Sequence, residues 1–390
     1  MPGPGARALR LAAVCAALTT LPALGPAAAS AGQRQADQRL DRAIRALVST
    51  PDGPPGIAAV VQRGGERRLH SFGRADVARR GRIGLRTHLR IASVTKAFTG
   101  AVLLRLVSAG KLKLDTNVGS LRPDLPAAWG PITLRQLLYH TSGLPNYTAN
   151  PAFGAYFGIH LKDYISPHYA ISFVFGEPLE FAPGARYEYS NTDNVVMALM
   201  AETATGRRWE RLLRDLLLRP LKLTDTGLPA GFELPRPFAR GYFYNGPGSL
   251  EDVSEEISVS SVWAAGGIVS SPRDLNRFIR AWAGGSLVAG RKLRAAQTAF
   301  LPPFTGGEPI GPGQNRGGLT IFRYRTPCGV VYGHTGNFPG YTQFIAASPD
   351  GSRSAVVSAN LQSDVKSGPP GIFPPLRRVF RRAACAALAG

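Results

Sequence analysis

The hydrophobic and polar positions of this chain divide it into β-rich ends and a helical middle. Near the N-terminus, residues 56–62 (GIAAVVQ) and 68–73 (RLHSFG) flank a Gly-Gly pair and predict two strands joined by a turn. Near the C-terminus, three further strands are predicted over 328–334, 341–348 and 354–360, the last two joined by Pro-Asp-Gly. The two ends therefore predict one antiparallel sheet.

Helical periodicity fills most of the space between these strands. Apolar residues recur at helical spacing in four segments of the middle region, namely 98–107, 133–140, 194–205 and 211–218. A further helix is predicted over 36–49, where Leu40, Ile44 and Leu47 share one face. The Gly/Pro-rich residues 302–318 predict a surface loop.

These patterns predict an α+β fold in which helices flank the sheet. We expect a single catalytic domain over 32–390. Its sheet part covers about 32–90 and 255–390, and its mainly helical part, about 91–254, is inserted between them.

The first 31 residues have the pattern of a secretory signal peptide. Arg7 and Arg10 precede an apolar run from Leu11 to Leu24, and small residues at 29–31 suit a signal peptidase, so cleavage is expected after Ala31. The alternative is a membrane anchor, but the run is interrupted by Thr and Pro and is shorter than the ~20 apolar residues of a span. We predict a secreted protein associated with the cell envelope, without a transmembrane segment in the mature chain.

Charge adds an expectation about partners. Removing residues 1–31 leaves 44 basic and 25 acidic residues, a formal charge of +19. Such an excess attracts polyanions, and an exported protein meets anionic wall polymers and lipid headgroups, whereas nucleic acid is not an expected partner. The arginines are scattered except at 377–382 (RRVFRR), so a generally basic, soluble surface is the alternative.

Two cysteines, Cys328 and Cys385, remain after processing. An even pair in an oxidising compartment predicts a disulfide bond, and two unpaired buried thiols are the alternative. No histidine or cysteine group has metal-ligand spacing, so neither a metal nor a cofactor is expected.

One lysine is out of place in the predicted helix that begins near residue 93. In IASVTKAFTGAVLL (91–104), Lys96 is the only charge, and Ser93 lies three positions earlier on the same helical face. Ser-x-x-Lys also occurs at Ser108 and Ser363, but only Ser93 stands at the start of an apolar helix, where backbone N–H groups favour developing negative charge. Burial would lower the pKa of Lys96 and make it a base. A serine cap with a snorkelling lysine is the structural alternative.

Two further motifs suit acyl transfer. Tyr189-Ser190-Asn191 follows a Pro-Gly turn and precedes a predicted helix; a phenol can relay a proton, and an amide can hold a peptide carbonyl. His334-Thr335-Gly336 ends a predicted strand, where glycine allows a substrate backbone to approach. As an isolated tripeptide, Tyr-Ser-Asn is more often involved in loop hydrogen bonding, and a lone histidine is usually a structural hydrogen-bond partner.

Taken in order, Ser-Val-Thr-Lys, Tyr-Ser-Asn and His-Thr-Gly resemble the serine β-lactamase and penicillin-binding protein superfamily, in particular its class C-like branch with secreted D-alanyl-D-alanine carboxypeptidases. Further stretches, such as ITLRQLLYHTSGL, AGGIVSSPRDL and GHTGNFPGY, look similar. The likeness runs from about residue 35 to residue 360.

The resemblance implies roles for the motif residues. Ser93 would be the nucleophile, Lys96 its partner in proton transfer and Tyr189 a proton shuttle; the general base is either Lys96 or Tyr189. Asn191 would hold the substrate amide, and the backbone N–H groups of Ser93 and Asn337 would form the oxyanion hole. His334 is placed with the catalytic residues. The remaining substrate-binding candidates are Thr335, Gly336, Thr148, Trp263 and Arg323.

One departure bears on the activity. β-Lactamases of this branch usually have Lys-Thr-Gly where this chain has His-Thr-Gly, and the histidine form resembles the carboxypeptidases. We therefore expect a D-alanyl-D-alanine carboxypeptidase or transpeptidase that acts on peptidoglycan stem peptides and is acylated by penicillins. A β-lactamase or esterase of the same superfamily is the alternative, and a non-catalytic wall-binding protein is a third reading. The residue after the triplet, Asn337, is not the hydroxyl residue typical of those carboxypeptidases.

Overall fold

The computed structural model describes residues 1, 3, 30–302, 311–312 and 314–390. Most of the predicted signal segment therefore lies outside the described residues. The first helix, α1 (Ala31–Val48), begins with a capping box in which Ser30 accepts from the backbone N–H of Gln33. Among the described residues, no helix combines the length and the apolar character needed to cross a membrane.

The two ends of the chain form one antiparallel sheet, as the sequence predicts, but the described sheet has seven strands where five were predicted. One of the added strands, over 314–317, occupies part of the predicted surface loop 302–318, because its backbone pairs with the strand over 322–326. The order of the sheet is β2-β1-β11-β10-β9-β8-β7, so that the N-terminal hairpin joins the C-terminal strands through the β1–β11 pair, where Ile57 lies opposite Ala359. The strands are β1 (Gly56–Arg63), β2 (Glu66–Gly73), β7 (Gln314–Gly317), β8 (Phe322–Thr326), β9 (Gly329–Phe338), β10 (Tyr341–Ala347) and β11 (Arg353–Ala359).

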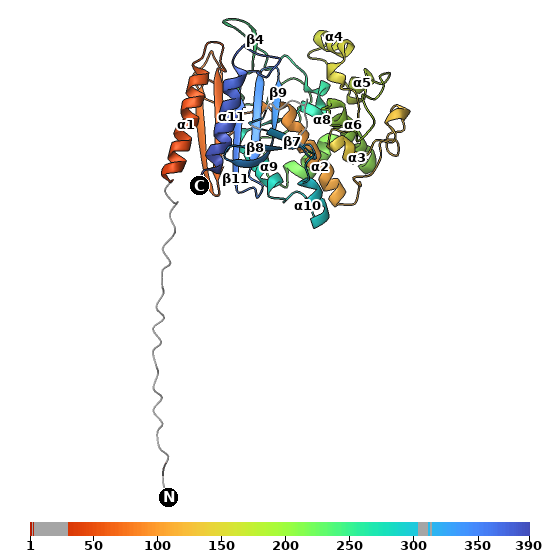
Figure 1. Ribbon diagram of the computed structural model, residues 1–390, viewed down its shortest axis with the longest axis horizontal. Coiled ribbons are helices and arrows are strands. Elements are labelled where there is room, and N and C mark those ends of the chain that lie inside the picture. Colours follow the sequence, from red (N-terminus) through yellow and green to blue (C-terminus); the bar gives the residue numbers. More distant parts are fainter. Residues whose placement is uncertain (2, 4–29, 303–310, 313) are drawn as a thin grey trace.

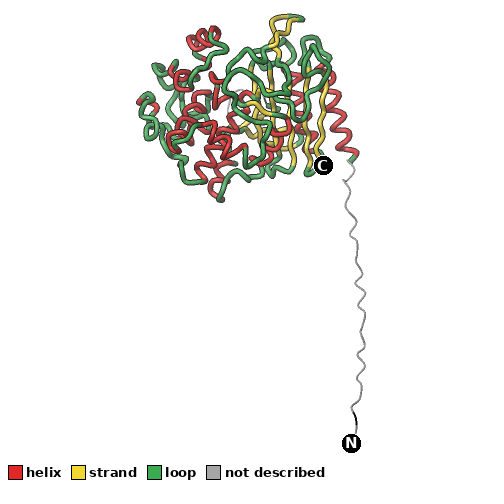
Figure 2. The backbone as a smooth tube through the Cα atoms, turned by 180° about the vertical axis from the view of Figure 1, so that it is seen from behind, coloured by secondary structure: helices red, strands yellow, loops and turns green. Residues whose placement is uncertain are grey.

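Helices cover both faces of this sheet. On one face α1 packs beside α11 (Phe373–Leu388), as Figure 1 shows at the left. On the other face lies α9 (Pro272–Ala283), and α2 (Thr95–Ser108) packs against α9 through the stacked rings of Phe98 and Phe278. Figure 2 shows helices on both sides of the strands. The strands thus form the middle layer, and the α+β prediction is confirmed.

The helical part surrounds α2 and α6 (Asn191–Thr205), whose side chains are buried on nearly all sides. Five residues of the helix predicted over 211–218, namely 214–218, instead belong to a π-helical segment, η4 (Arg214–Leu218), which continues α7 (Trp209–Leu213). The other helices are α3 (Leu134–Leu138), α4 (Pro151–Ile159), α5 (Pro167–Ser172), α8 (Trp263–Gly266), α10 (Arg291–Gln297), η1 (Ala92–Val94), η2 (Ala127–Trp129), η3 (Tyr147–Ala149) and η5 (Val259–Ser261).

Within the described part of the chain, two short strand pairs lie outside the main sheet. β3 (Leu89–Arg90) pairs with β6 (Val269–Ser270), and β4 (Tyr242–Gly246) pairs with β5 (Ser249–Asp252). The second pair is a hairpin within the region that the sequence assigns to helices. The division at about residues 90 and 254 stays a prediction.

The predicted disulfide is present. Cys328 lies in the β8–β9 turn and Cys385 in α11, with Cα atoms 5.3 Å apart and 57 residues of separation. The bond therefore fastens α11 to the sheet region that carries the His-Thr-Gly triplet.

Replacing both cysteines by serine should lower the free energy of unfolding by about 4 kcal/mol, because the bond restricts a long loop of the unfolded chain. Urea unfolding of the variant and of the oxidised protein measures this difference. The reduced parent protein should match the variant; equal midpoints for the oxidised protein and the variant would contradict the expectation.

Candidate active site

Ser93 occupies a strained turn at the start of α2. It is the middle residue of η1, and the residue before it, Ala92, has φ +51° in the left-handed region. A non-glycine residue in this region costs roughly 1–3 kcal/mol and is held there by its surroundings. The turn places Ser93 in the wall of a cleft while the rest of α2 runs into the core.

Lys96 is fully buried one turn after Ser93 (0% exposed). Its Nζ donates to Ser93 Oγ (3.2 Å), to Asn191 Oδ1 (2.6 Å) and to the backbone oxygen of Ala265 in α8 (2.7 Å). Three acceptors from three elements hold the amine beside the serine. A snorkelling lysine would instead reach water, so the structure supports the chemical reading of this pair.

Burial lowers the pKa of Lys96 to about 7, against an opposing effect of the nearby Asp193 carboxylate. A large part of the lysine population is therefore neutral at neutral pH. In that form Nζ can accept the proton of Ser93 Oγ.

Asn191 connects the lysine to a third residue of the cleft. While Oδ1 accepts from Lys96, Nδ2 donates to Thr148 Oγ1 (2.7 Å), and Thr148 in turn donates to Asn146 Oδ1 (3.1 Å). The same Asn146 oxygen accepts the backbone N–H of Asn191 (3.0 Å). Thr148 and Asn191, both predicted substrate-binding residues, thus lie together in the cleft wall. Asn146 was not predicted.

The Tyr189 ring packs against the Lys96 amine. Lys96 Nζ lies 4.8 Å from the centroid of the Tyr189 ring, within the range of a cation–π contact when the amine is protonated. The Tyr189 ring also packs against the His140 ring, with the two centroids 4.8 Å apart. Ser93, Lys96, Tyr189 and Asn191 are therefore gathered at one place, although the sequence separates them by almost a hundred positions.

A buried pair behind Tyr189 was missed in the sequence. His140 Nδ1 donates to Asp193 Oδ2 (2.7 Å), and Ser142 Oγ donates to Asp193 Oδ1 (2.5 Å). Burial raises the pKa of Asp193, and these two hydrogen bonds oppose the shift. Asp193 is also the charge that raises the pKa of Lys96. The only signal in the sequence was HTSG at 140–143, which gave no hint of an acidic partner.

We expect Asp193→Asn to move the acid limb of kcat/KM to lower pH. The carboxylate favours the protonated lysine, so its removal lowers the pKa of Lys96 further. The pH profile of the variant measures the shift.

Asp274→Asn is the matched control for this change. Asp274 is equally buried, and it accepts hydrogen bonds from Thr226 and from the backbone of Asp225 in a different part of the molecule. Asp274→Asn should reduce the stability of the protein without shifting the acid limb of the kcat/KM profile. An unchanged limb in Asp193→Asn would leave that residue with a structural role alone.

The His-Thr-Gly triplet lies on β9, beside the serine turn. His334 is buried and donates from Nδ1 to the backbone oxygen of Thr335 (2.5 Å), and burial lowers its pKa to about 3. The imidazole is therefore neutral at physiological pH. Thr335 is buried too, and its side chain forms a hydrogen bond with Tyr324. Burial raises the pKa of the Tyr324 phenol, and the hydrogen bond with Thr335 acts in the opposite direction.

Gly336 is the point at which β9 touches the serine turn. A Cβ at this position would lie 2.3 Å from the backbone oxygen of Ile91 and 3.2 Å from the backbone nitrogen of Ser93. Only glycine therefore permits this approach. It brings the backbone of Asn337 to the Ser93 turn, where the predicted oxyanion hole would lie.

A cleft of about 370 Å³ opens at Ser93. Much of its wall is apolar, with Phe153 and Phe157 from α4, Val262 before α8, and Phe338 with Pro339 after the triplet. The polar part of the wall includes Ser93, Thr148, Asn191, Ser261, Asn337 and Gln362.

Two amides in this wall have buried polar atoms without a partner among the described residues. The atoms are Nδ2 and Oδ1 of Asn337 and Oε1 of Gln362. A buried amide without a partner is costly, so such groups indicate a place that a ligand or water completes. Gln362, which follows β11, was not predicted.

Trp263 and Arg323 are not among the described lining residues of the cleft. Trp263 is buried, donates from Nε1 to Glu210 and packs edge-on against Trp209. Arg323 is half-buried in β8, opposite Tyr332 and Arg316. Their substrate-binding roles stay predictions.

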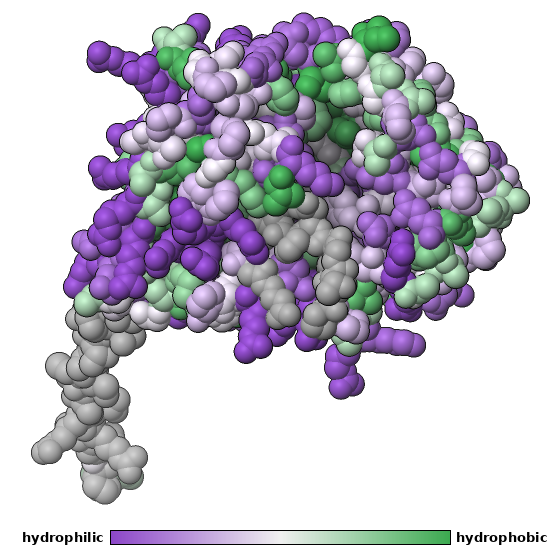
Figure 3. Space-filling model, turned by 45° about the horizontal axis from the view of Figure 1, so that its top comes forward, coloured by the Kyte–Doolittle hydropathy of each residue, from purple (hydrophilic) through white to green (hydrophobic). Residues whose placement is uncertain are grey.

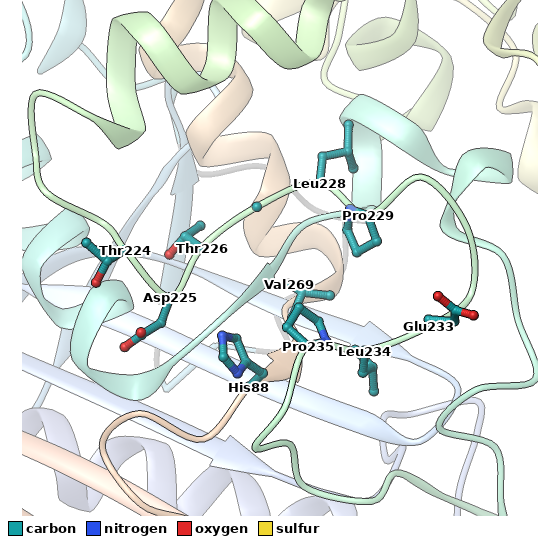
Figure 4. Close-up of a pocket in the computed structure, with 11 residues that line it drawn as sticks. His88, Thr224, Asp225, Thr226, Leu228, Pro229, Glu233, Leu234, Pro235 and Val269 are labelled. Carbon is teal, nitrogen blue, oxygen red and sulfur yellow. The ribbon is translucent and has the colours of Figure 1, made fainter.

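A second hollow, of about 440 Å³, shares no lining residue with this cleft. Figure 4 shows His88, Asp225 and Glu233 in its wall. The Asp225 carboxylate is already paired with Arg86 (2.9 Å) and Arg273 (2.8 Å). The described lining holds no nucleophile–base pair, and no three His, Cys, Asp or Glu side chains in the described part of the chain are grouped to hold a metal ion.

Comparisons with known proteins agree with this geometry. Residues 40–372 match the family model described as Beta-lactamase. Penicillin-binding protein 4* of Bacillus subtilis is 25% identical over 311 residues; the match covers 76% of this chain and 66% of that protein, just under two thirds of its length.

Two solved structures are similar over nearly their whole length. A D-stereospecific amidohydrolase from Streptomyces sp. has 30% identity and a TM-score of 0.74, covering 87% of this chain and 98% of that one. The D-amino acid amidase from Ochrobactrum anthropi SV3 has 26% identity and a TM-score of 0.76, covering 89% and 98%. The family match covers residues 40–372, and the serine turn and the buried lysine agree with it. The chain therefore belongs to the Beta-lactamase family of serine hydrolases and penicillin-binding proteins.

Proposed function

We propose that this protein is a secreted serine hydrolase that cleaves an amide bond after a D-amino acid residue through an acyl-enzyme on Ser93. The observation that carries the proposal is the hydrogen bond from the buried Lys96 amine, with its pKa of about 7, to Ser93 Oγ. The disulfide supports an oxidising compartment, in keeping with the predicted export.

The reaction runs in two halves. Neutral Lys96 takes the proton of Ser93 Oγ, the oxygen attacks the substrate carbonyl, and the backbone N–H groups of Ser93 and Asn337 hold the oxyanion. The C–N bond breaks as Tyr189, beside Lys96, passes a proton to the leaving amine. Water then attacks the ester by the reverse use of the same groups, and the acid and free Ser93 are released.

The comparisons favour D-configured substrates. Two leaving groups suit this mechanism: a D-amino acid, as in the D-alanyl-D-alanine carboxypeptidase predicted from the sequence, or a small amine, as in an amidase. The names of the two similar structures support D-amino acid amides. The aromatic wall formed by Phe153, Phe157 and Phe338 supports an acyl group with a large apolar side chain. We therefore place D-phenylalanine-type amides first and D-alanyl-D-alanine peptides second.

The two amides of the cleft wall would orient such a substrate. Oδ1 of Asn337 and Oε1 of Gln362 are acceptors without a described partner, and an amino or amide N–H of the acyl group can donate to them. This arrangement favours substrates with a nitrogen beside the scissile carbonyl over simple esters.

The test compares kcat/KM for D-phenylalanine amide, L-phenylalanine amide, an acylated D-alanyl-D-alanine peptide, a chromogenic cephalosporin and a short p-nitrophenyl ester. We expect the D-amide to exceed the L-amide by at least about a hundredfold and Ser93→Ala to abolish all turnover. Equal rates for the D- and L-amides would overturn the D-specific proposal. A dominant cephalosporin rate would make the enzyme a β-lactamase, and a dominant ester rate an esterase.

Gln362→Leu provides a finer test. It removes the amide without adding volume, so KM for the D-amide should rise about tenfold while the rate with the p-nitrophenyl ester stays near that of the parent. Equal losses with both substrates would assign Gln362 to structure instead.

A further inference from the structure

The two terminal helices of the domain bring eight arginines onto one surface. α1 carries Arg34, Arg39, Arg42 and Arg45, and α11 carries Arg377, Arg378, Arg381 and Arg382. The helices run antiparallel, because Ser30 at the start of α1 donates to the backbone oxygen of Gly390 after the end of α11. In the sequence only the second group was visible as a cluster. We call the eight residues together the arginine strip.

The apolar faces of both helices pack against the sheet, so the arginines lie on the side of the helices that faces away from it. Leu40, Ile44 and Leu47 of α1 and Leu376, Val379 and Phe380 of α11 are buried in one core cluster. Six of the eight arginines are exposed, and Arg377 and Arg381 are half-buried. Figure 3 shows hydrophilic side chains gathered on the α1 side of the molecule.

This positive charge is not neutralised locally. Apart from Arg34, none of the strip arginines forms an ion pair with a described carboxylate. α11 contains no acidic residue, and the two on α1 face elsewhere: Asp37 is paired with Arg63, and Asp41 accepts from His70.

Five of the strip arginines line two hollows beside α11. One of about 240 Å³ lies between the helices, with Arg39 and Arg382 in its wall, and another of about 700 Å³ is lined by Arg377, Arg378 and Arg381. Guanidinium forks match phosphate oxygens in pairs. At 1.5 Å per residue the two helices extend for about 25 Å, which suits a partner with charges repeated along its length.

We propose that the arginine strip binds a linear phosphodiester polymer of the cell envelope and thereby holds the enzyme there. A bilayer fits less well, because the large apolar side chains that the described structure exposes lie outside α1 and α11, so neither helix has an apolar face to insert. The strip covers the sheet face opposite α2, so the bound polymer leaves the cleft open (Figure 1). This inference is independent of the reaction at Ser93.

The experiment measures binding of fluorescent poly(glycerol phosphate) to the protein over a range of salt concentrations. The strip variant changes Arg39, Arg42, Arg378 and Arg382 to Gln, because these four are exposed and carry no described structural hydrogen bond. The matched control changes four cations elsewhere to Gln: Arg79, Arg80, Lys111 and Lys113.

We expect the strip variant to bind at least about tenfold more weakly at low salt and to lose about three units of the log–log salt slope, while the control variant changes less than about twofold. Both variants should keep kcat/KM for a small amide. Equal weakening in the two variants would mean diffuse attraction and overturn the proposal. Tighter binding to phosphatidylglycerol vesicles than to the polymer would overturn it as well, in favour of a membrane surface.

Discussion

Lys96→Met should lower kcat/KM by about a thousandfold while leaving the protein folded. The substitution removes the only amine bonded to Ser93 Oγ in the described structure but retains an unbranched chain that fits the buried space. General base catalysis contributes roughly 10²–10⁴-fold to rates, so a loss of this order is expected. Steady-state kinetics and thermal unfolding of the same preparation measure the two effects separately.

Lys111→Met is the matched control, because Ser108 and Lys111 have the same spacing as Ser93 and Lys96. Lys111 is exposed just beyond the end of α2, and its replacement should leave the rate unchanged. The parent enzyme adds a second readout: because the pKa of Lys96 is lowered to about 7 and the base is the neutral amine, kcat/KM should rise with pH up to about 7 and then level off. Full activity of Lys96→Met, or a rate that is flat below pH 7, would contradict the assignment of the base.

Gly336→Ala should lower kcat/KM by about a hundredfold with a smaller effect on stability. The added methyl group would meet the backbone oxygen of Ile91 at 2.3 Å, so β9 must move away from the serine turn. That movement separates the backbone N–H groups of Ser93 and Asn337, and misplacement by about 1 Å can cost 10²-fold in rate. Kinetics of the variant, together with its melting temperature, measures the loss.

Gly65→Ala is the corresponding control. Gly65 lies in the exposed β1–β2 turn, with no atom within 4 Å of an added Cβ and no positive φ to be strained. Its kinetics should match those of the parent. If Gly336→Ala kept the parent rate, the close approach of β9 would have no part in the chemistry.

The part of this account that the sequence predicts rests on short-range patterns. Ser93 and Lys96 were found because a three-residue spacing fixes their shared helical face, and a charge in an apolar helix is conspicuous. The sheet followed from apolar runs at both ends, and their pairing through β1 and β11 is confirmed. Tyr189 and Asn191 were found as a tripeptide whose partner, Lys96, lies beside it only in the folded protein.

The residues that were missed act through packing between distant segments. His140 and Asp193 are 53 positions apart and meet only because α6 passes the loop after α3. Gln362 was missed for the same reason. It follows β11, and the order β11-β10-β9 of the sheet brings this segment to the cleft beside the end of β9. The β4–β5 hairpin was also missed, since Tyr242 is held by backbone bonds to Asn360 and Gln362 rather than by a local signal.

The most direct test of the central claim is to locate the acyl group during turnover. The protein is mixed with D-phenylalanine amide, or with benzylpenicillin for a slower release, quenched in acid and digested, and the modified peptide is sequenced by mass spectrometry. We predict an acyl ester on Ser93 alone, absent from Ser93→Ala. Turnover that persists in Ser93→Ala, or an acyl group on another residue, would contradict the account.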